Sequence, residues 1–137
     1  MINTPSLGVV SLTASQSPIT LTLQEAQVSA GQELHGIVEI GYQGRYDSLV
    51  INSQIERSND VFSYVGLNGK KVKHPYARYS IFKSELGGRS KIEFVAVTSH
   101  VPEGADTPTV AKFRVSLIQE HKEVATDIKH VSITRSA

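Results

Sequence analysis

The chain has 137 residues, no cysteine and a formal net charge of +1, with 39% hydrophobic and 20% charged residues. This length suits a single domain with a proper core, and the composition is that of an ordinary globular protein. The lack of cysteine excludes disulfides and thiolate metal sites. The small net charge argues against a dedicated nucleic-acid-binding protein.

The N-terminal residues 1–13 have neither the basic region nor the apolar core of a secretory signal. No apolar run approaches the length of a membrane span. We therefore expect a soluble, cytoplasmic protein whose residues 1–137 form one domain.

Most of the chain alternates apolar and polar residues with the period of a β-strand. In residues 18–24, for example, Ile19, Leu21 and Leu23 alternate with polar residues. Such alternation is typical of antiparallel sheets with one packed and one solvated face. In chain order, strands are predicted at residues 8–13, 18–24, 34–40, 47–57, 61–66, 91–98, 110–120 and 124–134.

Turn residues separate these runs at Gln43-Gly44, Asn68-Gly69, Gly87-Gly88 and residues 102–104. Residues 74–88 break the pattern, because Pro75 and Gly87 flank apolar residues at helical spacing. A short helix and a further strand are equally compatible with this segment.

The alternation also slips within residues 123–134, which predicts a β-bulge near Lys129 or His130. In residues 91–99, Val95 and Val97 make both faces of the strand apolar, so part of it is expected to be covered twice.

Two segments carry a family resemblance. In residues 28–42, a turn at Gly31 precedes a strand with a second glycine, Gly36, inside it. Residues 92–119 contain an alternating strand, a proline-containing loop and another strand. The matching positions are Val28, Gly31, Gln32, Leu34, Gly36 and Val38 in the first segment, and Phe94, Pro102, Pro108, Phe113 and Val115 in the second.

On these residues the chain resembles the arrestin superfamily, specifically a single arrestin domain of the N-terminal type. The resemblance implies a β-sandwich that acts as a non-catalytic scaffold and presents sheet edges and loops to other proteins. Receptor binding is not implied, because the chain has room for one such domain only. Gly31 is expected to make the turn, and Gly36 to let a neighbouring backbone or side chain come close.

The strongest local candidate for a binding site is residues 68–83, which are basic, contain no acid and interleave aromatic residues. Positive charge beside aromatic rings suits an acidic peptide, a phosphate or single-stranded nucleic acid. Alternatively, the aromatic residues cover one end of the sandwich and the lysines solvate a loop. The predicted partner-binding residues are Lys70, Lys71, Lys73, Tyr76, Arg78 and Tyr79.

Other chemistry has weaker support in the sequence. The five histidines have no metal-ligand spacing, and no nucleophile elbow is present. Residues 87–90 offer backbone N–H groups to an anion, but a tight turn explains them more simply. Residues 62–69 carry few charges and suit either an edge strand or an internal one.

These features predict an all-β protein, an antiparallel β-sandwich of immunoglobulin-like or arrestin-like type with at most one short helix. We expect a non-enzymatic adaptor or scaffold without cofactor or metal. Its protein partner would bind an exposed sheet edge or the basic-aromatic loop 68–83, and a homodimer through edge strands is a further hypothesis. The alternative is a ligand-binding module for carbohydrate or an anionic headgroup, with Tyr64, Tyr76 and Tyr79 as its platform.

Overall fold

A computed structural model describes residues 17–104 and 107–135, so the strand predicted at 8–13 lies outside the described residues. These residues form two five-stranded sheets. The strands are β1 (Ile19–Leu23), β2 (Gln27–Ser29), β3 (Leu34–Ile40), β4 (Ser48–Ile55), β5 (Phe62–Leu67), β6 (Lys70–Tyr76), β7 (Arg78–Phe82), β8 (Lys91–Thr98), β9 (Thr109–Gln119) and β10 (Lys122–Thr134), and helix α2 spans Lys83–Leu86.

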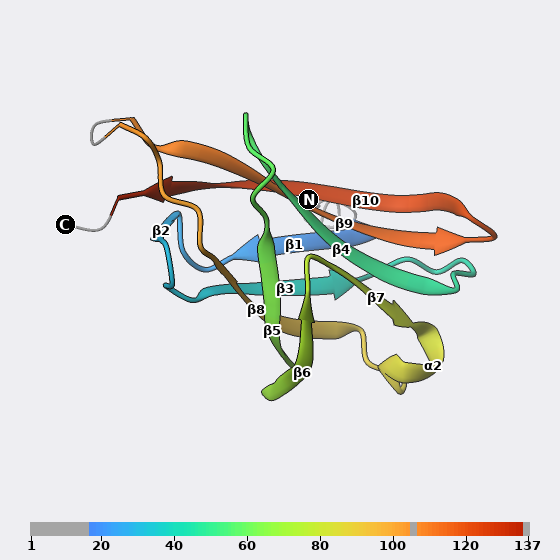
Figure 1. The fold of residues 1–137 in the computed structure, drawn as a ribbon. Helices are drawn as coiled ribbons and strands as arrows, with labels where there is room; N and C mark the ends of the chain where they lie inside the picture. The colour runs from blue at the N-terminus through green and yellow to red at the C-terminus, as the bar shows by residue number, and fades with distance from the viewer. Residues whose placement is uncertain (1–16, 105–106, 136–137) are drawn as a thin grey trace, which may run out of the picture.

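The two sheets pack face to face as a sandwich. The first has the strand order β1-β3-β8-β5-β6 and the second β2-β10-β9-β4-β7. In Figure 1, β9 and β10 of the second sheet run above β1 and β3 of the first. Strand pairing is antiparallel except between β2 and β10. The predicted all-β sandwich with one short helix is therefore confirmed.

The chain crosses between the sheets on both sides of the sandwich. On one side, the chain passes from β1, at the edge of the first sheet, to β2, at the edge of the second. On the other side, it passes from β6, at the edge of the first sheet, to β7, at the edge of the second. Across the β1 side, the Asp127 carboxylate of β10 accepts a hydrogen bond from the Leu21 N–H at 2.8 Å. This bond occupies a backbone donor on the outer edge of β1, which would otherwise be free to pair with another chain.

Residues 74–88 contain strands and only one helical turn. A helix beginning at Pro75 is wrong, because β6 extends to Tyr76 and β7 follows at once. In β7, Ile81 is buried and Tyr79 packs on the core, so the strand period decides this segment. The single turn of α2 ends at Gly87, which has a left-handed φ of 61° as expected for a helix stop.

The bulge in β10 is not at Lys129 or His130 but between Glu123 and Ala125. Ala125, Val131 and Ile133 are buried on one face of β10, and Ile128 lies half-buried on the opposite face. The apparent slip in the sequence therefore arises from an apolar residue on the outer face, not from a change of register.

The core centres on four aromatic side chains, which are Phe62, Tyr64 and Phe94 of the first sheet and Phe113 of the second. Phe94 of β8 stacks on Phe113 of β9 with ring centroids 6.0 Å apart, and Tyr64 packs edge-on against both. Gly36 of β3 lies directly opposite Phe94 in the register. A Cβ at Gly36 would lie 2.2 Å from the Phe94 ring, so only glycine leaves room for it. The expected close approach at Gly36 is thus confirmed.

We expect Gly36→Ala to destabilise the protein by about 1–3 kcal/mol, because the added methyl group overpacks the core against Phe94. Urea unfolding followed by circular dichroism measures this change. In the Phe94→Leu background the same substitution should cost less, since the smaller side chain can give way. An equal cost in both backgrounds would show that the Phe94 ring is not the obstacle.

Candidate functional site

The first sheet ends in a hairpin whose outer strand is β6. Asn68 and Gly69 form its two-residue turn with φ angles of 51° and 81°, as a type I′ turn requires. The turn is also tied to the neighbouring strand β8. The Asn68 N–H donates to the Glu93 carbonyl at 2.7 Å, and the Glu93 N–H donates to the Asn68 side-chain oxygen at 2.9 Å. The predicted turn is confirmed, and it holds the end of β6 in place.

Among the edge strands of the two sheets, β6 is the longest, with seven residues against five in β1 and β7 and three in β2. It pairs only with β5. The edge of β1 is partly occupied by Asp127, and β2 is too short to bind a long segment. Of the described edge strands, β6 is therefore the longest. Its register with β5 shifts between Lys71 and Tyr76, so the regular part beside the turn is the part suited to pairing with another chain.

A groove on the outer face of the first sheet adjoins this edge. His35, Val95, Gly66 and Lys71 form one cross-strand row over β3, β8, β5 and β6. Gly66 interrupts the row of side chains, and a Cβ there would lie 3.3 Å from the Val95 side chain. The resulting groove has a volume of about 420 Å³ and is lined by Gln24, Glu33, His35, Gly36, Ile37, Val65, Gly66, Gly69, Lys70, Lys71, Glu93, Phe94 and Val95.

The groove has charges of opposite sign at its two ends. Lys70 and Lys71 line it at the β6 end, and Glu33 and His35 line it at the β3 end. His35 Nδ1 is 2.7 Å from a Glu25 carboxylate oxygen, and its Nε2 is 3.5 Å from Glu33. The floor between the two ends includes the apolar side chain of Val95 and one further acid, Glu93 of β8.

The two acids beside His35 stabilise its protonated form. The hydrogen bond to Glu25 is the main cause that raises the pKa of His35 above its usual value, against the smaller effect of burial. Burial alone would raise the pKa of Glu25, but hydrogen bonds from the His35 backbone and ring outweigh it and lower the pKa. The β3 end of the groove therefore becomes more negative when His35 loses its proton.

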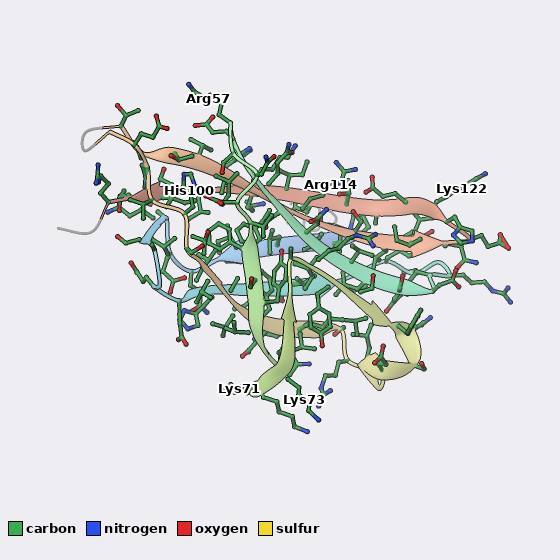
Figure 2. The ribbon with its side chains drawn as sticks, in the orientation of Figure 1. Arg57, Lys71, Lys73, His100, Arg114 and Lys122 are labelled. Carbon is green, nitrogen blue, oxygen red and sulfur yellow. The ribbon has the colours of Figure 1, made fainter. Side chains whose placement is uncertain are left out.

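The predicted binding residues are only partly brought together. Lys70 and Lys71 line the groove. Figure 2 shows Lys71 and Lys73, both exposed, projecting together below β6, whereas Lys122 lies at the right-hand tip of the β9–β10 hairpin. Arg78 is exposed on β7 in the second sheet, and Tyr79 packs partly against the core. Tyr76 belongs to β6, but its side chain lies outside the described part of the structure.

Of the two alternatives for residues 62–69, the internal strand is the one found, since β5 lies between β8 and β6. Two finer predictions about this region are wrong. Residues 68–83 are not a loop, because they include β6, β7 and the start of α2. Tyr64 cannot serve in a binding platform, because its side chain is only 1% exposed and packs among the core aromatic rings. The second apolar face expected for residues 91–99 is only partly covered, because Val95 and Val97 are half-buried and Val95 lines the groove.

A second polar cluster, absent from the sequence predictions, joins two connections of the sandwich. His100 Nδ1 is 2.7 Å from an Asp60 carboxylate oxygen, and its Nε2 is 3.3 Å from the Thr109 hydroxyl. The hydrogen bond with His100 lowers the pKa of Asp60. Thr98 extends the cluster by accepting from the His100 N–H and donating to the Val61 carbonyl. No local motif relates these residues, which meet only in the fold.

An acid, an imidazole and a hydroxyl in series can activate a nucleophile in hydrolases. Here the same three groups connect the segment after β4 to the segment after β8, and the His100 side chain is only 13% exposed. We interpret the cluster as structural, because its hydrogen bonds hold these two connections together.

Comparisons with known proteins show the fold and nothing finer. No family model and no curated protein matches the chain. Among solved structures, the CFA/I adhesin CfaE of enterotoxigenic E. coli gives a TM-score of 0.55 at 13% identity, covering 88% of this chain and 49% of the adhesin. The chain thus spans about half the length of that protein.

Two structures of F-spondin domains are also similar in fold. The human reeler domain gives a TM-score of 0.51 at 8% identity, covering 86% of this chain and 90% of that domain. The Reelin-N domain structure gives 0.52 at 8% identity, covering 91% and 97%.

The arrestin resemblance is therefore wrong. The similar solved structures are an adhesin and reeler domains, not arrestins, and no family model supports the resemblance. The glycine at position 36, which suggested the arrestin signature, is explained by the Phe94 ring that packs against it. In the described residues, no helix is long and apolar enough to cross a membrane.

The pH dependence of stability should contain a contribution from His35. Because its pKa is raised on folding, the contribution is complete below the unfolded value of about 6.5 and is lost as pH rises through the folded pKa. With a ring that is 40% exposed, we expect less than about 1 kcal/mol.

Urea unfolding of the wild type and His35→Gln between pH 5.5 and 8.5 checks this expectation. Subtracting one free energy of unfolding from the other cancels the contributions of the other histidines. The difference that remains should shrink as pH rises. A difference that is constant over this range would mean that the Glu25–His35 contact does not favour the protonated ring.

Proposed function

We propose that the chain is a non-enzymatic binding module that acts as an adaptor, adding an extended segment of a protein partner to the free edge of β6. The observation that carries the proposal is the edge strand β6, which its turn holds in place and which pairs on one side with β5, through Lys70, Lys71 and Tyr76. Such edges bind extended peptides through backbone hydrogen bonds, while neighbouring side chains select the sequence.

The side chains around β6 favour an acidic partner segment with an apolar residue. Lys71 and Lys73 are two residues apart, so both occupy one face of the strand. An acid on the neighbouring face of an added strand would pair with them across the new ladder. An apolar side chain at a diagonal position could reach the hollow over Gly66, beside Val95.

The structural neighbours are compatible with a module that binds rather than catalyses. One is an adhesin, and the likeness covers about half of that protein. The cytoplasmic location expected from the sequence stays a prediction, and the proposed interaction does not depend on it. A second copy of this chain is one candidate partner, since two β6 edges can pair with each other.

Site-specific crosslinking tests where the partner binds. A photoreactive benzoylphenylalanine replaces Lys73 in one bait and Lys122, at the β9–β10 turn, in a matched control. After illumination in extract of the source organism, the Lys73 bait should give a specific partner adduct and the Lys122 bait none. Equal adducts from both baits, or adducts from Lys122 alone, would move the interaction away from β6. An adduct of twice the chain's mass would identify a second copy as the partner.

A proline at Lys71 tests whether the partner pairs with the backbone. Leu67 and Lys70 flank the two-residue turn and so share its closing hydrogen bonds, which directs the Lys71 N–H away from β5. Lys71→Pro removes this outward donor, whereas Lys71→Ala removes only the charge.

We expect Lys71→Pro to weaken partner binding by at least about tenfold and Lys71→Ala by less, since one backbone hydrogen bond and the strand geometry are lost together. Binding of the purified crosslinked partner, measured by biolayer interferometry, gives both values. Equal affinities for the two variants would reject strand addition and leave only a role for the lysine charge.

A further inference from the structure

A separate pocket lies at the end of the sandwich beside α2. It is formed where the chain after β3 faces α2 and the turn that follows it, and its volume is about 330 Å³. This volume is at the lower end for small-molecule sites, which suits a ligand of about one sugar ring. The pocket shares no lining residue with the groove beside β6.

Two tyrosines give the pocket preformed aromatic walls. Tyr42 and Tyr46 contact each other edge-on with ring centroids 6.5 Å apart, and both pack partly against the core. The Tyr42 ring also covers Gly44, where a Cβ would lie 2.6 Å from its phenol end. Because each ring is held by these neighbours, a ligand would not have to order them.

Two cations line the same pocket. Lys83 Nζ is 4.5 Å from the centroid of the Tyr46 ring, and Arg89 lies in the turn after α2. No carboxylate is among the described residues that line the pocket. Three acids are adjacent in sequence to lining residues. Glu85 accepts from the Phe82 N–H, Asp47 accepts from the Glu120 N–H, and Glu39 lies in β3 opposite Lys91 of β8. The pocket therefore has the charge of an anion site.

We propose that this pocket binds an acidic sugar, a single ring that carries a carboxylate or sulfate. The sugar ring packs against Tyr42 and Tyr46, whose amphipathic rings supply apolar faces and hydroxyls. The anionic group lies between Lys83 and Arg89, and Arg89 can bind it with two parallel hydrogen bonds. The side chains of Gln43 and Ser90 also line the pocket and can bind the sugar hydroxyls.

The proposal moves sugar recognition away from the tyrosines that the sequence suggested. Tyr64 is buried in the core, whereas Tyr42 and Tyr46 are half-buried at the mouth of a pocket beside two cations. It is independent of partner binding at β6, and either can fail without the other.

Titrations followed by ¹H–¹⁵N NMR of the full chain test the proposal. The probes are methyl glucuronide, the methyl glycoside of N-acetylneuraminic acid, glucose 6-sulfate, neutral methyl glucoside and sodium acetate. We expect saturable shifts at Tyr42, Tyr46 and Arg89 with at least one acidic sugar, and at least about tenfold weaker binding of the neutral sugar and of acetate. If no acidic sugar binds, or acetate or the neutral sugar binds equally well, the proposal is overturned.

A charge-matched pair of variants locates the site. Lys83→Gln with Arg89→Gln should weaken binding of the acidic sugar by at least about tenfold, because both ionic contacts are lost. Arg57→Gln with Lys122→Gln removes the same charge elsewhere and should leave the affinity unchanged. All four side chains are exposed, so both variants should keep dispersed native spectra. Equal weakening in both variants would mean that only the overall charge matters.

A further titration with an oligosaccharide distinguishes whether the sugar is a single unit or part of a polysaccharide. If the pocket takes an internal unit of an acidic polysaccharide, an alternating heptasaccharide of glucuronate and N-acetylglucosamine that begins and ends with N-acetylglucosamine should bind at least as tightly as the single sugar, with the same residues shifted. If only a free or terminal sugar fits, this heptasaccharide, whose glucuronates are all internal, should bind at least about tenfold more weakly. Both results support an acidic-sugar site and differ only in its source.

Discussion

The contact between Gly36 and Phe94 is the constraint on which the arrangement of both sheets depends. The Phe94 ring lies over the backbone of β3 and reaches across the interior to Phe113 of the second sheet. A side chain at position 36 would push this ring away, and Tyr64 and Phe62, which pack on Phe113, would have to move with it. The glycine thus sets how closely β3, β8 and β9 approach one another.

The β3–β8 register that this contact fixes also determines which side chains line the groove beside β6. With Gly36 opposite Phe94, the neighbouring pair is His35 and Val95, whose side chains alternate to the outer face. A bulge at Val65 then places Gly66 beside Val95 and opposite Lys71. Two glycines therefore act on opposite faces of one sheet, since Gly36 admits a core ring and Gly66 leaves a hollow outside.

Local patterns predicted the elements well where a single interaction decided them. Residues 91–98 coincide with β8, because their alternation reflects one buried face, and Asn68-Gly69 forms the turn that its φ angles demand. The sequence left the structure open where the helical period and the strand period overlapped. Tyr79, Phe82 and Leu86 have helical spacing, but pairing with β4 fixes residues 78–82 as a strand and leaves Phe82 61% exposed.

The candidate sites were harder to predict, because each depends on distant segments. The row from His35 to Lys71 requires the register of four strands, and no local signal relates those residues. Likewise, Tyr42 and Lys83 share a pocket only because the Lys83 N–H donates to the Asp47 carbonyl and so brings α2 next to the chain after β3. A basic segment can be recognised in a sequence, whereas the surface it belongs to follows from pairing.

The two proposed surfaces share one physical property, which is that neighbouring contacts order them before any ligand arrives. At the tip of the β6 hairpin, Asn68 donates to the Glu93 carbonyl and accepts from the Glu93 N–H. In the pocket beside α2, the Tyr42 ring packs over Gly44. Binding to a preordered edge or pocket loses less conformational entropy than binding to a free loop. The two proposals therefore rest on the same kind of feature: a glycine creates the space at each surface, and a hairpin turn or an aromatic pair keeps that space in shape.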